Sequence, residues 1–66
     1  MEIFINGSVQ QVNDHINLID LIAILGITGR RLAIEVNKEI IPRSTYMNYY
    51  LKPNDHVEIV HAIGGG

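Results

Sequence analysis

The chain has 66 residues, of which 47% are hydrophobic, and a formal net charge of −2 at pH 7. This length suits one small domain with a thin core, so a deep active site built by the chain alone is disfavoured. The sequence contains no cysteine, which excludes disulfides, thiolate metal sites and a cysteine nucleophile, and its five basic residues form no stripe of the kind that binds nucleic acid.

The first twelve residues favour a β-hairpin. Residues 1–5 alternate as a strand does, Asn6-Gly7 follows, and residues 8–12 give a second, more weakly patterned strand. Asn and Gly both tolerate the positive φ of a type I′ turn, which makes Asn-Gly between two extended runs a strong hairpin signal. The opening residues lack the basic region and apolar core of a signal peptide, so we expect a cytoplasmic location.

A short amphipathic helix is expected next. Asn17 is suited to cap it, residues 18–25 form it, and Gly26 supplies a left-handed stop. Its apolar face is made by Leu18, Leu21, Ile22 and Leu25. The stretch contains Asp20 and is far shorter than the roughly 20 residues that span a bilayer, so we expect no membrane partner. A helix with one buried face needs a sheet to pack against.

The second half of the chain reads as three further strands. Residues 32–36 alternate apolar and polar side chains, and residues 40–41 form a short strand that Pro42 ends. Residues 43–52 are expected to be irregular or to form a short turn of helix, with Arg43 and the tyrosines packing inside this loop. The last strand is expected at residues 56–61.

The order of the expected elements is strand, strand, helix, strand, short strand, strand. A hairpin followed by a helix packed across a small sheet is the natural closure of that order. We therefore predict an α+β protein of the β-grasp class, with a mixed sheet of about five strands and one main helix. The domain is expected to cover residues 1–62, and residues 63–66 are expected to form a flexible tail.

Three glycines close the chain, and two interpretations of them stay open. Glycines at a terminus are common in frayed ends and in expression remnants. Here they follow directly from a predicted strand, which favours a functional tail. Residues 62–66 reach roughly 17 Å when fully extended. Because glycine lacks a Cβ, such a segment can thread a narrow channel.

The chemistry open to such a tail centres on its terminal carboxylate, which is ionised at neutral pH. A carboxylate is a poor acylating group, but attack on the α-phosphate of ATP converts it to an acyl-adenylate. A sulfur donor can then displace AMP and leave a thiocarboxylate. A chain of this size lacks the pockets for these steps, so a partner enzyme must supply them and the chain itself is predicted not to be an enzyme.

The whole chain resembles the ThiS family, the ubiquitin-like β-grasp sulfur carriers of thiamine biosynthesis. The resemblance begins with Asn6-Gly7 after the opening strand and the Leu-rich helix. It continues in the stretch Val36-Asn37-Lys38-Glu39-Ile40-Ile41-Pro42-Arg43 and in the last strand that leads into the glycines. The chain has Pro53-Asn54-Asp55 where family members often have Asp-Gly-Asp, and Asn54 can adopt the left-handed conformation that glycine would supply.

The resemblance implies a role for the tail. Gly66 would be adenylated by an E1-like activating enzyme that uses ATP, converted to a thiocarboxylate by a sulfur donor system, and would pass its sulfur to thiazole synthase. Ile63, Gly64 and Gly65 would be the threading arm. The chain itself would bind no cofactor. Because the family ends in diglycine, Gly65 would carry the sulfur if Gly66 were not native.

A docking surface is expected on the outer face of the sheet. If Ile3 and Ile5 face the helix, strand alternation places Phe4, Val60 and Ala62 on the opposite face. A small apolar patch there suits a partner that handles the tail. The competing interpretation is that these are scattered exposed apolar residues, which are common.

Other chemistry has little support in the sequence. The three histidines, His15, His56 and His61, lie in separate elements or on opposite faces of one strand, so we expect no metal site. The hydroxyl residues Ser8, Ser44 and Thr45 lack the Gly-x-Ser-x-Gly surroundings of a hydrolase nucleophile.

Three alternative functions stay open. The small subunit of molybdopterin synthase uses the same thiocarboxylate chemistry, and a protein-conjugating modifier would use the same adenylated tail. A ubiquitin-like binding module with an inert tail is the third. Removing the last glycine separates the last alternative from the others, because an inert tail predicts no loss of function.

Overall fold

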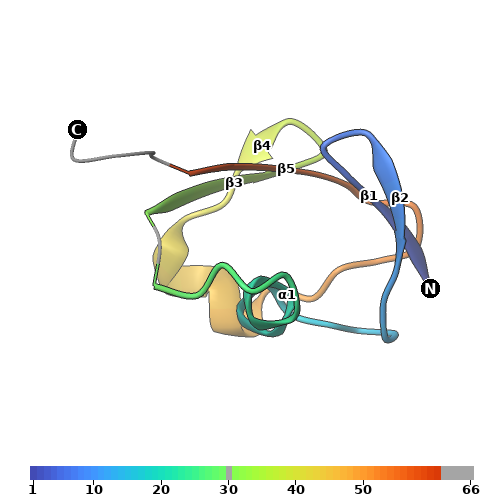
Figure 1. The fold of residues 1–66 in the computed structure, drawn as a ribbon, viewed down its shortest axis with the longest axis horizontal. Helices are drawn as coiled ribbons and strands as arrows, with labels where there is room; N and C mark the ends of the chain where they lie inside the picture. Colours follow the sequence, from blue (N-terminus) through green and yellow to red (C-terminus); the bar gives the residue numbers. More distant parts are fainter. Residues whose placement is uncertain (30, 62–66) are drawn as a thin grey trace.

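The computed structural model describes residues 1–29 and 31–61. Its elements, in chain order, are β1 (Glu2–Ile5), β2 (Ser8–Gln11), α1 (Leu18–Ile24), β3 (Leu32–Val36), β4 (Glu39–Ile40), the 3₁₀ helix η1 (Arg43–Asn48) and β5 (His56–His61). The strands form one layer, and α1 and η1 both lie on the same side of it (Figure 1).

The five strands form a mixed sheet in the order β2-β1-β5-β3-β4. The first strand and the last strand are neighbours and run parallel, whereas the other three pairs are antiparallel. This confirms the predicted α+β architecture with five strands and one main helix. The last strand, β5, occupies the centre of the sheet, so the chain leaves the domain from its middle strand.

The core lies between the sheet and the two helices. The helix buries Leu18 and Leu21 completely and Ile22 almost so, as its apolar spacing predicted. Alternate strand residues meet them from the sheet, namely Ile3, Ile5, Ile34, Val36, Val57 and Ile59. Because a strand places successive side chains on opposite faces, the residues between these lie on the open face of the sheet.

Both ends of α1 are held as the sequence indicates. The side-chain Oδ1 of Asn17 accepts a hydrogen bond from the backbone N–H of Asp20 at 2.7 Å. At the other end Gly26 has φ +73°, the left-handed conformation that glycine adopts without a steric cost. The helix ends at Ile24, one residue before its predicted end, because Leu25 is the C-cap residue. No described helix is long and apolar enough to cross a membrane.

Two tight turns set the register of the hairpins. Asn6 and Gly7 have φ values of 49° and 85°, as expected for the predicted type I′ turn. Asn37 and Lys38 also have positive φ, 52° and 71°, and this turn starts β4 at Glu39 rather than at the predicted residue 40. The loop predicted as irregular or as a turn of helix contains η1.

Candidate functional site

The residues predicted to carry the chemistry, Ile63, Gly64, Gly65 and Gly66, lie outside the described residues, as does the predicted docking residue Ala62. What the structure fixes is the point from which they start. His61 is the last residue of β5 and is in register with Leu32, the first residue of β3. The candidate site is therefore the end of the sheet at which β5 finishes, together with the open face beside it.

The open face carries both described docking residues. Val57 and Ile59 are 1% and 7% exposed on the helix side, so the alternate residues of β5 face the opposite way. Val60 is 66% exposed there. Phe4 is in register with His56, four residues before Val60, which separates the two by about 13 Å along the strand. The two residues share a face but belong to different parts of it.

Phe4 also has a partner that sequence reasoning missed. Its ring stacks on the ring of His56, with centroids 4.5 Å apart and planes inclined by 12°. The pair becomes visible only once β1 and β5 are placed side by side in parallel, because the two residues are 52 positions apart. Within residues 1–29 and 31–61, no group of three or more potential metal-ligating side chains occurs.

Two further exposed apolar residues lie on the open face. Val9 is in register with Phe4, and Ile40 is in register with Glu35, so each faces the same side as its partner. Val9 is 53% exposed and Ile40 is 75% exposed. Neither was predicted as a docking residue. The register of the two hairpins, which their turns determine, is the signal that would have placed them there.

The middle of the open face is acidic. Glu35 of β3 and Glu58 of β5 are directly opposite each other in the antiparallel pair. Like charges at such positions repel and reduce stability. The only ion pair among the described residues joins the N-terminal amine to Asp14, so neither glutamate has a cationic partner in that part of the chain. The open face therefore combines exposed apolar side chains with two carboxylates that face each other.

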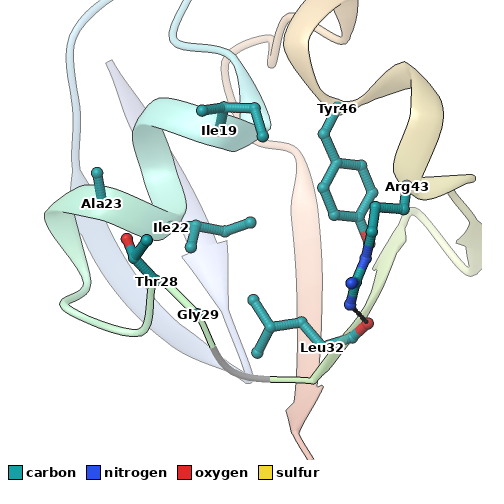
Figure 2. A pocket seen from close by; sticks show the side chains of 8 residues that line it. All are labelled: Ile19, Ile22, Ala23, Thr28, Gly29, Leu32, Arg43 and Tyr46. Carbon is teal, nitrogen blue, oxygen red and sulfur yellow. Dashed lines mark hydrogen bonds between the residues drawn. The ribbon is translucent and has the colours of Figure 1, made fainter.

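The helix side of the domain has an apolar groove of about 330 Å³. Figure 2 shows its lining residues, which come from α1, the segment after it, β3 and η1: Ile19, Ile22, Ala23, Thr28, Gly29, Leu32, Arg43 and Tyr46. Arg43 reaches across this end of the domain and donates a hydrogen bond from Nη2 to the carbonyl oxygen of Leu32 at 3.2 Å. The described lining residues include no carboxylate, histidine or cysteine for acid–base or nucleophilic chemistry.

Tyr49, on the segment after η1, is the one described residue with a marked change in acidity. Burial raises the pKa of its hydroxyl, and the negative charges of Asp55 and Glu39 raise it further. A raised pKa keeps the hydroxyl protonated at neutral pH, so it is not a base at physiological pH. The raised pKa of Tyr49 therefore affects the stability of the fold at high pH.

Comparison with known proteins shows which proteins share this sequence pattern and fold. The ThiS family model matches residues 3–66. The chain is 40% identical over 47 residues to the sulfur carrier protein ThiS of Bacillus subtilis, covering 71% of each. It is 36% identical over all 66 residues to a thiazole synthase of Paramagnetospirillum magneticum. It spans only 20% of the length of that protein.

A solved structure agrees with this match. The crystal structure of the thiamine biosynthesis protein ThiS from Geobacter metallireducens superimposes with a TM-score of 0.85 at 26% identity, and the match covers both chains completely. The solution structure of a thiamine biosynthesis protein from the same organism gives a TM-score of 0.81.

Proposed function

The chain belongs to the ThiS family, and from this premise we propose that it is a sulfur carrier protein of thiamine biosynthesis. Proteins of this kind are substrates of other enzymes. The observation that carries the proposal is that the family match continues from the β-grasp domain through the glycine tail to Gly66. The tail follows the central strand in the sequence, which supports a role in carrying a carboxylate into another protein.

The proposed cycle begins with activation of the tail. The carboxylate oxygen of Gly66 attacks the α-phosphorus of ATP, the bond to the β-phosphate breaks, and pyrophosphate leaves. The resulting acyl-adenylate has AMP as a good leaving group. Hydrosulfide, or its equivalent from the donor system, then attacks the carbonyl carbon, the bond to AMP breaks, and the tail ends in a thiocarboxylate. A donor that carries a persulfide must also supply two electrons, for example from a second thiol, to cleave the acyl disulfide that forms first. An E1-like adenylating enzyme supplies the ATP site, and a separate donor system supplies the sulfur.

The proposed acceptor is thiazole synthase. Two proteins with that name contain a segment similar to all 66 residues of this chain, and the chain spans one fifth of each. A carrier-like segment within a protein named thiazole synthase supports direct transfer between the two. As the sulfur moves to the acceptor, the acyl carbon takes an oxygen from the acceptor or from water in its place, so the tail is a carboxylate again and the carrier is reused. In this cycle Ile63, Gly64 and Gly65 are the segment that enters each partner in turn.

We further propose that the open face docks the partner while the tail reacts. Phe4, Val60 and Ala62 are its predicted contacts, and Ala62 lies between β5 and the glycines in the sequence. The face has exposed apolar residues at both ends and Glu35 and Glu58 between them. It therefore suits a partner surface that presents a cationic side chain flanked by apolar ones. Phe4 and Val60 lie on the same face about 13 Å apart along the strand direction, so a partner that contacts both must cover both parts of the face.

Intact mass spectrometry tests the proposal directly. The purified chain is incubated with ATP, a cysteine desulfurase system and the E1-like enzyme of its own host. The expected product is heavier by the exchange of one oxygen for one sulfur, and a variant that lacks Gly66 should not form it. The variant that lacks Gly66 still ends in the diglycine Gly64-Gly65, so product formed by it would assign the sulfur to Gly65. A second variant that lacks both Gly65 and Gly66 is the control that should form no product in either case.

The same experiment separates the alternatives. An unchanged mass, with the enzyme shown to be active on another carrier, would leave the binding module with an inert tail. Conjugates of higher mass that contain an isopeptide bond to lysine would indicate a protein modifier. Transfer of the sulfur to a molybdopterin precursor in place of the thiazole synthase reaction would assign the chain to that pathway.

A further inference from the structure

At the end of the sheet from which the tail leaves, β3 and β5 extend beyond the strands on either side. The β3–β5 pair extends from Val36 and Val57 to Leu32 and His61. Its neighbours stop earlier, because β1 pairs with β5 only as far as Val57 and β4 pairs with β3 only at Glu35 and Val36. The two central strands therefore extend past both flanking strands. Among residues 1–29 and 31–61, no strand pairs with the backbone groups on the outer edges of this extension.

On the β1 side, the side chain of Asn6 takes the place of the missing strand. Its Oδ1 accepts a hydrogen bond from the N–H of Ile59 at 2.9 Å, and its Nδ2 donates to the carbonyl of Ile59 at 3.2 Å. A side-chain amide offers the same donor and acceptor as a peptide group, so it can continue a β-ladder. The backbone N–H of Asn6 also donates to Val57 at 2.9 Å, which makes Asn6 the last rung on this side.

On the β4 side, Arg43 serves the same purpose. The carbonyl of Ile34 accepts from the backbone N–H of Ile41 at 2.9 Å. The next carbonyl on the same edge, two residues earlier, is that of Leu32, and it accepts from Arg43 Nη2 (Figure 2). Leu32 is in register with His61, so Arg43 supports the strand residue that lies beside the start of the tail.

We propose that Asn6 and Arg43 are positioning residues for the tail. They complete the hydrogen bonding of the extended β3–β5 pair, so that the tail starts from a fixed point and a fixed direction. The inference rests on the proposed function, because a fixed starting point matters only if the tail must enter a partner. Neither residue touches the reacting atoms in this scheme, and the docking face is left intact when either is changed.

Loss of the Asn6 contacts frees the β1 edge of β5 after Val57. β3 still pairs with the other edge of β5 as far as His61, so the tail then starts from a strand that is held on one edge only. The direction in which the tail leaves the sheet is less well fixed, so we expect a decrease of roughly three- to tenfold in kcat for adenylation. KM should change little because the docking face is unchanged.

Matched variants separate this effect from the turn conformation. Asn6→Gly keeps the positive φ and removes only the side chain. Asn6→Asp keeps the acceptor for the Ile59 amide and should retain part of the activity. Asn54→Gly is the control, because it makes the same change at another positive-φ turn residue away from the end of the sheet where the tail leaves. For the other side, Arg43→Met keeps the aliphatic contacts in the groove, and Arg43→Lys restores a donor.

The experiment joins two measurements on each folded variant. Hydrogen exchange at the Ile59 amide, followed by NMR, reports the hydrogen bond itself. ATP–pyrophosphate exchange with the E1-like adenylating enzyme reports kcat and KM for the tail. We expect Asn6→Gly to lose protection at Ile59 and to lower kcat, Arg43→Met to lower kcat, and Asn54→Gly to match the wild type in both.

The outcomes distinguish the two proposals. If the wild type is adenylated and both Asn6→Gly and Arg43→Met match Asn54→Gly in kcat, the positioning role is wrong and the carrier function stands. A change in KM alone would also overturn it, since that result assigns the residues to docking. If the wild type is not adenylated by an enzyme that is active on another carrier, the proposed function fails and the positioning role falls with it.

Discussion

At the scale of single residues, the chain uses asparagine where many proteins use glycine. Asn6, Asn37 and Asn54 all have positive φ, and the sequence allowed the turn at Asn6 and the left-handed position of Asn54 to be predicted from local preference. The side-chain partners were not predictable in the same way. Asn37 accepts from the N–H of His56 and donates to Asp55, each at 3.0 Å, and these partners are 18 or 19 residues away.

Lys38 is the residue whose backbone conformation fits its side chain least well. It has φ 71° in a two-residue turn whose type favours Asn-Gly. We expect Lys38→Gly to raise the free energy of unfolding by about 0.5–1 kcal/mol, because relief of the left-handed strain exceeds the entropy that glycine adds to the unfolded chain. Urea denaturation measures the change. Glu39→Gly is the control one residue later, without positive φ, and it should destabilise; a loss of stability in Lys38→Gly would contradict the argument.

Tyr49 gives a prediction about pH. Its pKa in the folded chain is raised, chiefly by burial and then by Asp55 and Glu39, above the ordinary value of about 10. The folded state therefore holds this proton more tightly than the unfolded state does. The stability that results is fully present below pH 10 and is lost as the pH rises through the folded-state pKa.

Tyr49→Phe should remove this dependence. The free energy of unfolding of the wild type is expected to fall more steeply above about pH 10 than that of the variant, because phenylalanine has no proton to lose. Denaturant unfolding between neutral pH and pH 11 measures both curves. Tyr50→Phe is the control on the neighbouring exposed tyrosine. Parallel curves for the wild type and Tyr49→Phe would show that another group causes the loss.

At the scale of elements, the spacing of hydrophobic residues predicted the buried face of the helix, but local sequence did not predict where every strand begins. The face of α1 was predictable because four apolar residues recur at helical spacing and three of them are buried. The start of β4 was not, because it depends on a two-residue turn with lysine at positive φ. The 3₁₀ helix η1 has no strong spacing signal, and Tyr46 is its one buried residue.

Asn17 bonds to two of these elements, so its substitution should reduce the free energy of unfolding more than the loss of a simple helix cap would. Its Oδ1 caps α1, and its Nδ2 donates to the carbonyl of Met47 in η1 at 3.1 Å. We expect Asn17→Ala to cost about 1–2 kcal/mol, a large share of the roughly 3–10 kcal/mol that a chain of this size has. Asn17→Asp keeps the cap and loses only the second bond, so it should cost about half as much in urea denaturation. If Asn17→Ala and Asn17→Asp cost the same, the whole loss of stability would come from the hydrogen bond to Met47 in η1.

At the scale of the whole molecule, the sheet has a different task on each face. One face builds the core with α1 and η1, and the other is left open with exposed apolar residues around two facing carboxylates. Alternation in the sequence was enough to place Phe4 and Val60 on the open face. Their separation, the stacking of Phe4 on His56 and the facing of Glu35 and Glu58 all depend on which strands pair, and strand pairing cannot be read from local pattern.

A facing pair of carboxylates costs stability. Because this pair lies at the centre of the proposed docking face, we expect removal of one charge to stabilise the free chain but to weaken partner binding. Glu58→Gln removes the repulsion with Glu35 and should raise the free energy of unfolding by roughly 0.2–1 kcal/mol. If the partner presents a cation to the pair, the same substitution should weaken binding to the E1-like enzyme by about two- to fivefold, and less at high salt.

Glu39→Gln is the matched control for that prediction, since it removes the same charge from a residue in register with the buried Val36 rather than from the open face. Denaturation and equilibrium binding at two salt concentrations, with ATP absent, measure both effects without the chemistry of the tail. A Glu58→Gln variant that gains stability and binds as the wild type does would show that the partner approaches elsewhere. A variant that binds more weakly while gaining stability would show that the open face gives up stability in the free carrier to bind its partner.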